Sequence, residues 1–361
     1  MTPCPSITPH DDALPRLTLL DQTLPLLLSA PCVLVGLSGG RDSIALIESL
    51  RLLRGCSPIG CHVHHGIRTD EADRDANFSR QWCLERDIPF LIKKVDVPLL
   101  AHDGKISIEE AARHARRQCF EEWATQEGTK VIALAHHIND QAETILLNLC
   151  RGSAGIRGMK PVSTTSTTST TSTTSTTSTT STTSTTSTVS TTSDKLTILR
   201  PLLAHTREQL THFLQERHLT WVDDSTNDTQ DYTRNALRHN ILPRLNDIMH
   251  RDVTPIICRS SRLAHETETA LDQALDLMEL TDPQGRLYLP KIITLPPALK
   301  KAAIFRYLKQ AGIPKLTEEI TIRVLDILNK DTPTASSKIM LPGGWIASRK
   351  EKRLRLLPPT A

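Results

Sequence analysis

The chain has 361 residues, which is enough for two or three domains with a substantial core. Its 43 Lys and Arg residues nearly balance 40 Asp and Glu residues, and the net charge of +3 excludes nucleic-acid binding driven by bulk positive charge. The eight cysteines are scattered without a CxxC pair, which excludes a zinc ribbon and a disulfide framework and favours reduced thiols.

Residues 1–29 are predicted to form an N-terminal extension. They lack the basic start and the long apolar segment of a signal peptide. The apolar run at 24–28 is far too short to span a bilayer. We therefore expect a cytoplasmic protein without a membrane segment.

The most informative stretch is VLVGLSGGRDS, residues 33–43. An apolar run, typical of a buried parallel strand, leads directly into Ser38–Ser43, and a helical pattern follows from Ile44 to Arg54. Free backbone N–H groups and the positive end of the helix dipole converge at such a turn, so it is predicted to bind phosphate. A capped glycine turn without a ligand is the alternative interpretation.

The pattern of this loop separates it from two common nucleotide-binding loops. It has neither the lysine of the Walker pattern GxxxxGK[ST] nor the dinucleotide pattern GxGxxG. SGGxDS is similar to the pyrophosphate-binding loop of the ATP pyrophosphatases, which split ATP between its first and second phosphates. The similarity implies an ATP-binding loop in which Asp42 could hold Mg²⁺. The loop residues are Ser38, Gly39, Gly40, Arg41, Asp42 and Ser43.

Strand and helix patterns alternate after the loop. Strand-like runs occur at 59–63, 90–95, 131–135 and 196–199, with helical patterns at 70–85 and 107–127. This order predicts an α/β fold, a doubly wound parallel sheet with helices on both faces. In such a sheet, ligands bind beyond the carboxyl ends of the strands.

The motif AHHINDQAET, residues 135–144, follows the fourth predicted strand. Asp140, Glu143 and Arg151 share one face of the helix expected there. Paired carboxylates beside a phosphate loop suit Mg²⁺ or general base chemistry, although an acidic helix N-terminus would also explain them. Zinc binding by His136 and His137 is disfavoured, because adjacent residues of an extended segment face opposite ways and no third ligand accompanies them.

A low-complexity tract interrupts the chain from Ser163 to Ser193. Serine recurs there at every third position with threonines between, broken only by Val189. Such a tract has little to bury and is expected to be disordered. It would be an insertion in a loop of a catalytic domain that spans residues 30–215.

The motifs on both sides of the tract resemble those of the tRNA(Ile)-lysidine synthases. The similarity rests on the segments 136–159, 200–203 and 223–243, with supporting matches at His65–Arg68 and Glu110–Arg116. They occur in the family's order across residues 33–243. The chain departs from the family pattern at Arg117, Ala154, Ser225 and Leu237, and none of these changes removes a charge that the chemistry needs.

The resemblance implies a two-step ligation on the wobble cytidine of tRNA(Ile) with a CAU anticodon. ATP adenylates the 2-carbonyl oxygen of the cytosine, and the amine of free L-lysine then expels AMP to give lysidine. Asp42 and Asp140 would act with Mg²⁺, Glu143 would orient the lysine ammonium or accept its proton, and His137 would approach the nucleotide. The residues implied in tRNA binding are Arg113, Arg116, Arg151, Arg200, Arg234, Asn235 and Arg238. A second copy of the chain, giving a homodimer, is a further candidate partner.

Two other functions fit parts of the sequence. A tRNA 2-thiolation enzyme of the same superfamily would need a CxxC pair or an activated cysteine, for which Cys150 is the nearest candidate. A non-catalytic RNA-binding descendant would have no need of Asp42, Asp140 and Glu143 beside a phosphate site.

No further motif is found beyond residue 244. Apolar residues at helical spacing predict helices within 258–280 and 296–329, and 337–357 is predicted to form two strands around Pro342–Gly344. Residues 216–361 are therefore expected to form a smaller, mainly helical domain that binds tRNA and ends in a β-hairpin. The residues expected on a basic face of this hairpin are Arg349, Lys350, Lys352, Arg353 and Arg355.

Overall fold

The computed structural model describes residues 14–67, 69–152, 156–165, 195–222, 232–328 and 337–359. Contacts divide the chain into two units, Met1–Ser261 and Arg262–Ala361. The acidic stretch 223–231 and the triplet tract beyond Thr165 lie outside the described residues. Within the described ranges, no helix combines the length and the apolar character needed to cross a bilayer.

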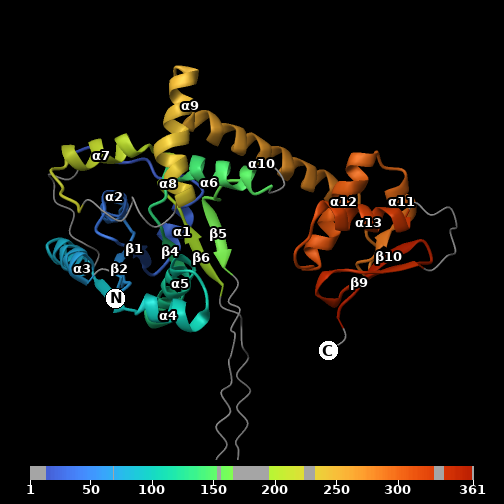
Figure 1. Ribbon diagram of the computed structural model, residues 1–361, viewed down its shortest axis with the longest axis horizontal. Helices are drawn as coiled ribbons and strands as arrows, with labels where there is room; N and C mark the ends of the chain where they lie inside the picture. The colour runs from blue at the N-terminus through green and yellow to red at the C-terminus, as the bar shows by residue number, and fades with distance from the viewer. Residues whose placement is uncertain are drawn as a thin grey trace, which may run out of the picture. The chain divides into compact units, whose positions relative to one another are not determined.

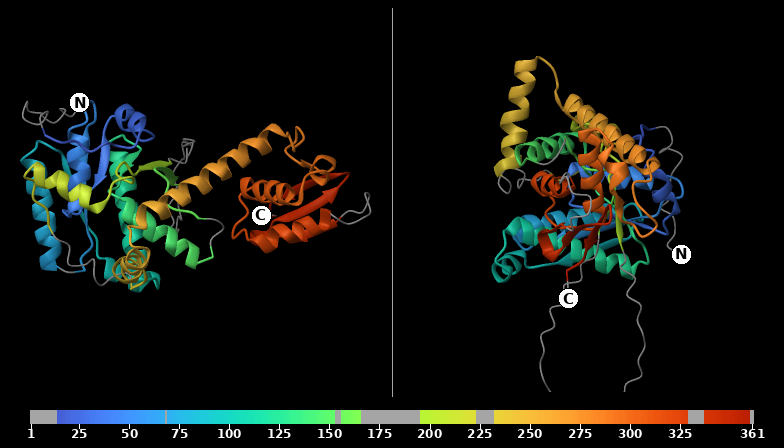
Figure 2. Two further views of the ribbon diagram at one scale, coloured as in Figure 1. Left: turned by 90° about the horizontal axis from the view of Figure 1, so that it is seen from above. Right: turned by 90° about the vertical axis from the view of Figure 1, so that its right-hand side faces the viewer.

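The first unit is built on a six-stranded sheet, which is drawn with its helices in Figures 1 and 2. Its strands are β1 (Val33–Gly36), β2 (Pro58–His64), β3 (Phe90–Lys94), β4 (Val131–Ala133), β5 (Val162–Thr165) and β6 (Leu196–Leu199). The order is β3-β2-β1-β4-β6-β5, and all neighbours are parallel except β5 and β6. The predicted doubly wound parallel sheet is confirmed, with its topological switch point between β1 and β4.

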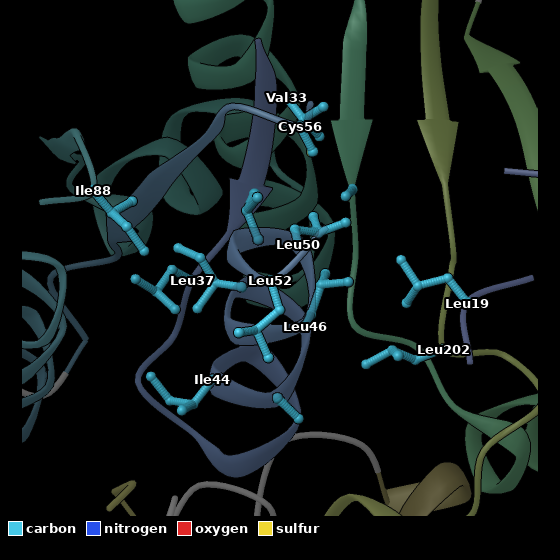
Figure 3. Packing of buried hydrophobic residues seen from close by; sticks show 14 of the residues in the cluster. Leu19, Val33, Leu37, Ile44, Leu46, Leu50, Leu52, Cys56, Ile88 and Leu202 are labelled. Carbon is cyan, nitrogen blue, oxygen red and sulfur yellow. The ribbon is translucent and has the colours of Figure 1, made fainter. Parts of the chain in front are cut away.

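The helices of the first unit include those that cover both faces of this sheet. They are α1 (Leu24–Ser29), α2 (Arg41–Arg51), α3 (Thr69–Leu84), α4 (Val97–Gly104), α5 (Ile108–Gln126), α6 (Ile138–Cys150), α7 (Arg207–Glu216), α8 (Tyr232–Ala236), the π-helix η3 (Leu237–Ile241), α9 (Leu242–Met249) and the first part of α10 (Thr254–Leu277). Val33 and Val35 of β1 share a core cluster with residues of α2 and α7, whereas Leu34 packs in a second cluster with residues of α5. Since successive side chains of a strand face opposite ways, β1 is buried on both sides. Figure 3 shows Ile44 and Leu46 of α2 in the first of these clusters.

A buried ionic cluster joins α2 to the end of α7. The Glu48 carboxylate of α2 accepts hydrogen bonds from Arg51 Nε and Nη2 at 2.8 and 2.9 Å. Arg217, which follows α7, donates from Nε to Glu48 Oε1 at 3.1 Å. Removing one member of such a cluster would leave a buried charge without compensation, so the contact strongly fixes the relative position of the two helices.

The triplet tract begins inside the sheet. Ser163–Thr165 belong to β5, which pairs with β6 from Leu196 to Leu199. The expectation that the tract is disordered from Ser163 onward is therefore wrong for these three residues. Ladder hydrogen bonds involve only the backbone, so a strand that has entered the sheet can continue through serine and threonine.

The second unit combines helices with a four-stranded antiparallel sheet. Its strands, in the order β7-β10-β9-β8, are β7 (Leu287–Tyr288), β10 (Arg353–Leu357), β9 (Ile346–Lys350) and β8 (Ser337–Met340). In Figure 1, α11 (Leu289–Ile293), α12 (Pro297–Gln310) and α13 (Glu318–Leu328) lie together on one side of strands β9 and β10. The predicted pairing on either side of Pro342–Gly344 is present as β8 and β9. The tail also contains β10, which the sequence pattern did not separate from β9.

The expected basic face of this tail is smaller than predicted. Arg349 is buried, and its Nη1 donates to the carbonyl of Ile327 at 2.8 Å. Arg353 pairs with Asp282, whose Oδ2 lies 2.9 Å from its Nε. Three basic side chains of the predicted face remain exposed, those of Lys350, Lys352 and Arg355.

Candidate active site

A cavity of about 550 Å³ opens in the first unit beside the carboxyl ends of β1 and β4. The residues predicted for the site that line it are Ser38, Gly40, Arg41, Asp42, Ser43, His137, Asp140, Glu143 and Arg238. The two loops that follow β1 and β4 therefore meet at the switch point of the sheet, as the strand order requires.

The glycine loop is held by its own serines. Ser43 Oγ accepts a hydrogen bond from Ser38 N–H at 3.2 Å and donates to the Gly40 carbonyl at 2.8 Å, and Ser43 is only 6% exposed. Ser38 Oγ accepts from Gly40 N–H at 3.3 Å. Gly39 has φ +87°, and a Cβ there would lie 3.1 Å from Ser79 Oγ, so this position requires glycine. Ser43 thus shapes the loop from within, which differs from the phosphate contact that its place in the motif suggests.

The loop is also paired with Val222, the described residue that precedes the acidic stretch 223–231. Val222 N–H donates to the Gly39 carbonyl at 3.0 Å, and Gly40 and Val222 form a parallel bridge. The chain that leads into the acidic stretch is thereby fixed against the glycine loop. Sequence reasoning gave no signal for this contact, because Val222 lies outside the motif.

His137 connects the two motifs at the bottom of the cavity. It is the N-cap of α6, where its Nδ1 accepts from Asn139 N–H at 3.2 Å and its own N–H donates to Asp140 Oδ2 at 3.0 Å. Its Nε2 lies 3.4 Å from Asp42 Oδ2 and 3.5 Å from Asp140 Oδ2. The proton on Nε2 faces both carboxylates, so His137 holds the two aspartates on either side of one N–H group.

The charges around Asp42 favour its ionised form. Burial raises the pKa of Asp42, but hydrogen bonding and charge from His137 and Arg41 outweigh it and lower the value to about 2. Burial lowers the pKa of His137, while Asp42 and Asp140 outweigh this effect and raise it. Two carboxylates on one side of a cavity are hard oxygen ligands of the kind that Mg²⁺ takes together with water and phosphate oxygens. In the part of the chain that the structure describes, no group of three or more His, Cys, Asp or Glu side chains is arranged to hold a metal ion.

Acid is expected to weaken the native state through Asp42. Its folded pKa of about 2 lies below the ordinary value of 3.8, so its stabilisation is fully present above the ordinary value and is lost as the pH falls toward 2. In urea titrations between about pH 5 and pH 3, the free energy of unfolding should fall more steeply for the unmodified chain than for Asp42→Asn. Asp103→Asn, at an exposed site of α4, should keep the slope of the unmodified chain. Equal slopes for the unmodified chain and Asp42→Asn would contradict this role.

Glu143 is the most deeply buried carboxylate of the cavity, at 1% exposure. Arg238, on η3, donates from Nε to Glu143 Oε1 at 2.7 Å and from Nη2 to Glu143 Oε2 and Asp140 Oδ1 at 3.2 Å each. Arg234, on α8, donates from Nη2 to Thr144 Oγ1 at 3.1 Å, and its Nε is 3.4 Å from Glu143 Oε2. Burial raises the pKa of Glu143, and the charge of Arg238 offsets part of this rise. A buried Glu143 with a raised pKa is suited to bind a cation or to accept a proton.

The two arginines predicted to grip RNA thus face the carboxylates of the cavity. Their spacing of four residues places them on one helix face, and both guanidinium groups reach α6. The spacing of Arg234 and Arg238 in the sequence does not show whether their side chains face solvent or α6. Their partners on α6 lie about 90 residues earlier in the chain.

Of the residues predicted to bind tRNA, Arg238 lines the cavity and the others do not. Arg113 and Arg116 are exposed on α5, and Asn235 is half-buried on α8. Arg200 donates from Nη1 to the Lys160 carbonyl at 2.8 Å and to Ser163 Oγ at 3.0 Å. Arg151 is exposed at the C-cap of α6. Although it shares a helix face with Asp140, the two positions are eleven residues apart, which corresponds to about 16 Å along the axis.

Sequence reasoning missed Arg207 and Asn139, which both line the cavity. Arg207 is the first residue of α7, and its backbone N–H donates to Asn139 Oδ1 at 3.2 Å. The preceding Thr206 forms a capping box with Gln209. The Thr-x-x-Gln pattern predicts the start of a helix soon after β6. Because ligands bind at the carboxyl ends of parallel strands, this pattern could have indicated that the helix N-terminus lies near the site.

Similarity to known proteins extends over most of the chain. Residues 17–245 match the model of the PP-loop domain family. A tRNA(Ile)-lysidine synthase from Parabacteroides distasonis is 32% identical over 339 residues, which are 91% of this chain and 68% of the relative. A protein of the same description from Chlorobaculum tepidum is 28% identical over 340 residues, or 90% of this chain and 93% of that one. The matched domain contains Asp42, Asp140, Glu143 and Arg238.

Proposed function

Because this chain belongs to the tRNA(Ile)-lysidine synthase family of PP-loop proteins, we propose that it joins free lysine to the wobble cytidine of tRNA(Ile) with a CAU anticodon. The chain is an ATP-binding ligase of tRNA processing, as the PP-loop domain and its named relatives indicate. The observation that carries the finer proposal is one cavity that combines a phosphate loop, an aspartate pair and the buried Glu143.

In the first proposed step, the 2-carbonyl oxygen of the cytosine attacks the α-phosphorus of ATP. The bond between this phosphorus and the bridging oxygen breaks, and pyrophosphate leaves. Backbone N–H groups of the glycine loop and the N-terminus of α2 would bind the phosphates. Asp42 and Asp140 would hold Mg²⁺, which neutralises phosphate charge when bound. His137 would keep the two carboxylates in place through Nε2.

In the second proposed step, the lysine amine attacks C2 of the adenylated cytosine and AMP leaves with the former carbonyl oxygen. The lysine ammonium must first lose a proton. Glu143 and Asp140 are suited to bind this ammonium, and the raised pKa of Glu143 suits proton acceptance. The guanidinium of Arg238 now occupies the space between both carboxylates, as a substrate cation would.

Binding of the tRNA is proposed to extend beyond the cavity. Arg113 is exposed on α5, where its charge is available to phosphate oxygens of RNA. Arg116 lies on the same helix, and burial lowers the pKa of its guanidinium. Arg113 pairs with Glu109 on the same helix face, and such an exposed pair exchanges readily for a phosphate contact. Arg113 is therefore a better candidate for the RNA backbone than Arg234 and Arg238, which contact carboxylates.

A 2-thiolation reaction is less compatible with this site. The exposed Cys150 lies at the C-terminal end of α6, whereas the catalytic candidates lie at its N-terminal end. No cysteine of the described residues lines the cavity. Sulfur transfer through a cysteine would need a thiol beside the activated base.

Incubation with Mg-ATP, labelled lysine and a transcript of the CAU tRNA(Ile) tests the proposal. Label is expected to enter the tRNA with release of one AMP and one pyrophosphate for each lysine. A methionine tRNA with the same anticodon serves as the control and should remain unlabelled. Pyrophosphate release without lysine transfer, or transfer of a sulfur donor in its place, would overturn the proposal.

A further inference from the structure

Arg207 is a cationic side chain of the cavity that has no direct partner for its guanidinium among the residues that the structure describes. It lines the cavity and is half-buried. Among the residues that the structure describes, none forms a hydrogen bond or an ion pair with its guanidinium. The other arginines of the cavity differ in this respect, since Arg41 pairs with Asp42 and Arg238 pairs with Asp140 and Glu143.

The position of Arg207 is rigidly fixed. The Thr206–Gln209 capping box and the hydrogen bond from Arg207 N–H to Asn139 Oδ1 anchor the start of α7 against the start of α6. The far end of α7 is held through Arg217 and the buried Glu48. The fold therefore places a guanidinium at the edge of the cavity on a backbone that cannot readily move away from it.

This placement is unfavourable unless an anion binds. Burial, Arg41 and Arg238 lower the pKa of Arg207, and the negative charges of Asp42 and Asp140 offset only part of this fall. The cavity is rich in carboxylates, yet Arg207 pairs with none of them. A half-buried cation that lies beside other cations and lacks a partner is stabilised when a ligand supplies the negative charge.

The position of Arg207 within the cavity indicates which part of ATP it contacts. After burial, Arg41 has the largest influence on Arg207, and Arg41 directly follows the glycine loop at the N-terminus of α2. We propose that Arg207 binds the β- and γ-phosphates of ATP and then the pyrophosphate that they become. This role rests on the proposed function, in which ATP is split between its first and second phosphates.

Equilibrium titrations of the purified full-length chain with Mg-ATP, Mg-pyrophosphate and AMP test this role. Arg207→Gln should weaken binding of ATP and pyrophosphate by about tenfold to a hundredfold, the range expected for a lost charge-assisted hydrogen bond. Binding of AMP should stay within about twofold of the unmodified chain. Arg207→Lys, which keeps the charge, should give intermediate values. Arg80→Gln, at an exposed site of α3, is the matched control and should change none of the three affinities.

Thermal unfolding without ligand separates this role from a structural one. Removing a half-buried charge without a partner should leave Tm unchanged or raise it, whereas loss of a structural contact would lower it by about 4 °C or more. Unchanged affinity for pyrophosphate, or equal weakening of ATP and AMP, would overturn the proposal. Because these titrations contain neither tRNA nor lysine, their result does not depend on whether the chain transfers lysine.

Discussion

Replacing Asp140 with asparagine is expected to lower pyrophosphate release by about a thousandfold without unfolding the chain. The side chain lies at the N-terminus of α6, 3.5 Å from His137 Nε2 and 3.2 Å from Arg238 Nη2. Asparagine can still accept the hydrogen bond from His137 N–H that caps the helix. It cannot supply the negative charge that the proposed Mg²⁺ site needs, so the first step should fail while the fold persists.

Single-turnover release of pyrophosphate, measured with saturating Mg-ATP and tRNA, checks this result. Circular dichroism and the Tm of Asp140→Asn should match those of the unmodified chain within a few degrees. Asp103→Asn, at an exposed site of α4, should release pyrophosphate at the unmodified rate. Retention of activity by Asp140→Asn would show that the catalytic carboxylate lies elsewhere.

Replacing Glu143 with glutamine is expected to separate the two steps of the reaction. Pyrophosphate release should persist within about tenfold, whereas lysine transfer should fall by about a hundredfold to a thousandfold. Glu143 is 1% exposed and contacts Arg238 and Arg234, so it lies deeper than the Asp42–His137–Asp140 group that faces the phosphate loop. Glutamine has the same shape and keeps one oxygen for Arg238, but it can neither neutralise an ammonium nor accept its proton.

The adenylated tRNA should therefore accumulate in Glu143→Gln. Parallel measurement of pyrophosphate and of labelled lysine in the same quenched samples gives both rates. Glu85→Gln, an exposed change at the end of α3, should leave both rates unchanged. An equal loss in both steps would mean that Glu143 supports the first step through Arg238 and Asp140, and the assignment to lysine would be wrong.

Local sequence was sufficient to predict the elements that carry the proposed phosphate site. The apolar run at Val33–Val35, the glycines of the loop and the helix after it follow each other directly in the chain. The alternation of strands and helices then predicted a sheet with a switch point, and the loops after β1 and β4 do meet there. The alternation of strands and helices predicts this meeting because both loops follow the carboxyl ends of parallel strands.

The direction of the arginine side chains could not be predicted in this way. Arg234 and Arg238 contact carboxylates of α6, while Arg207 reaches the cavity from a helix that carries no recognised motif. A spacing of four residues places two side chains on one helix face, but it does not say what lies opposite that face. The exposed Arg151 shows the same limit, because helix periodicity gives an angle around the axis and not a depth along it.

The sequence by itself determined the order of the elements, the phosphate loop and the acidic residues that enter the site, because each depends on residues that are neighbours in the chain. Only the tertiary structure decided how the charges are paired. It joined Asp42 to Asp140 through His137, covered Glu143 with Arg238, and left Arg207 for an anion. The physical reason is that ion pairs and hydrogen bonds form between side chains a few ångströms apart, whatever their separation in sequence.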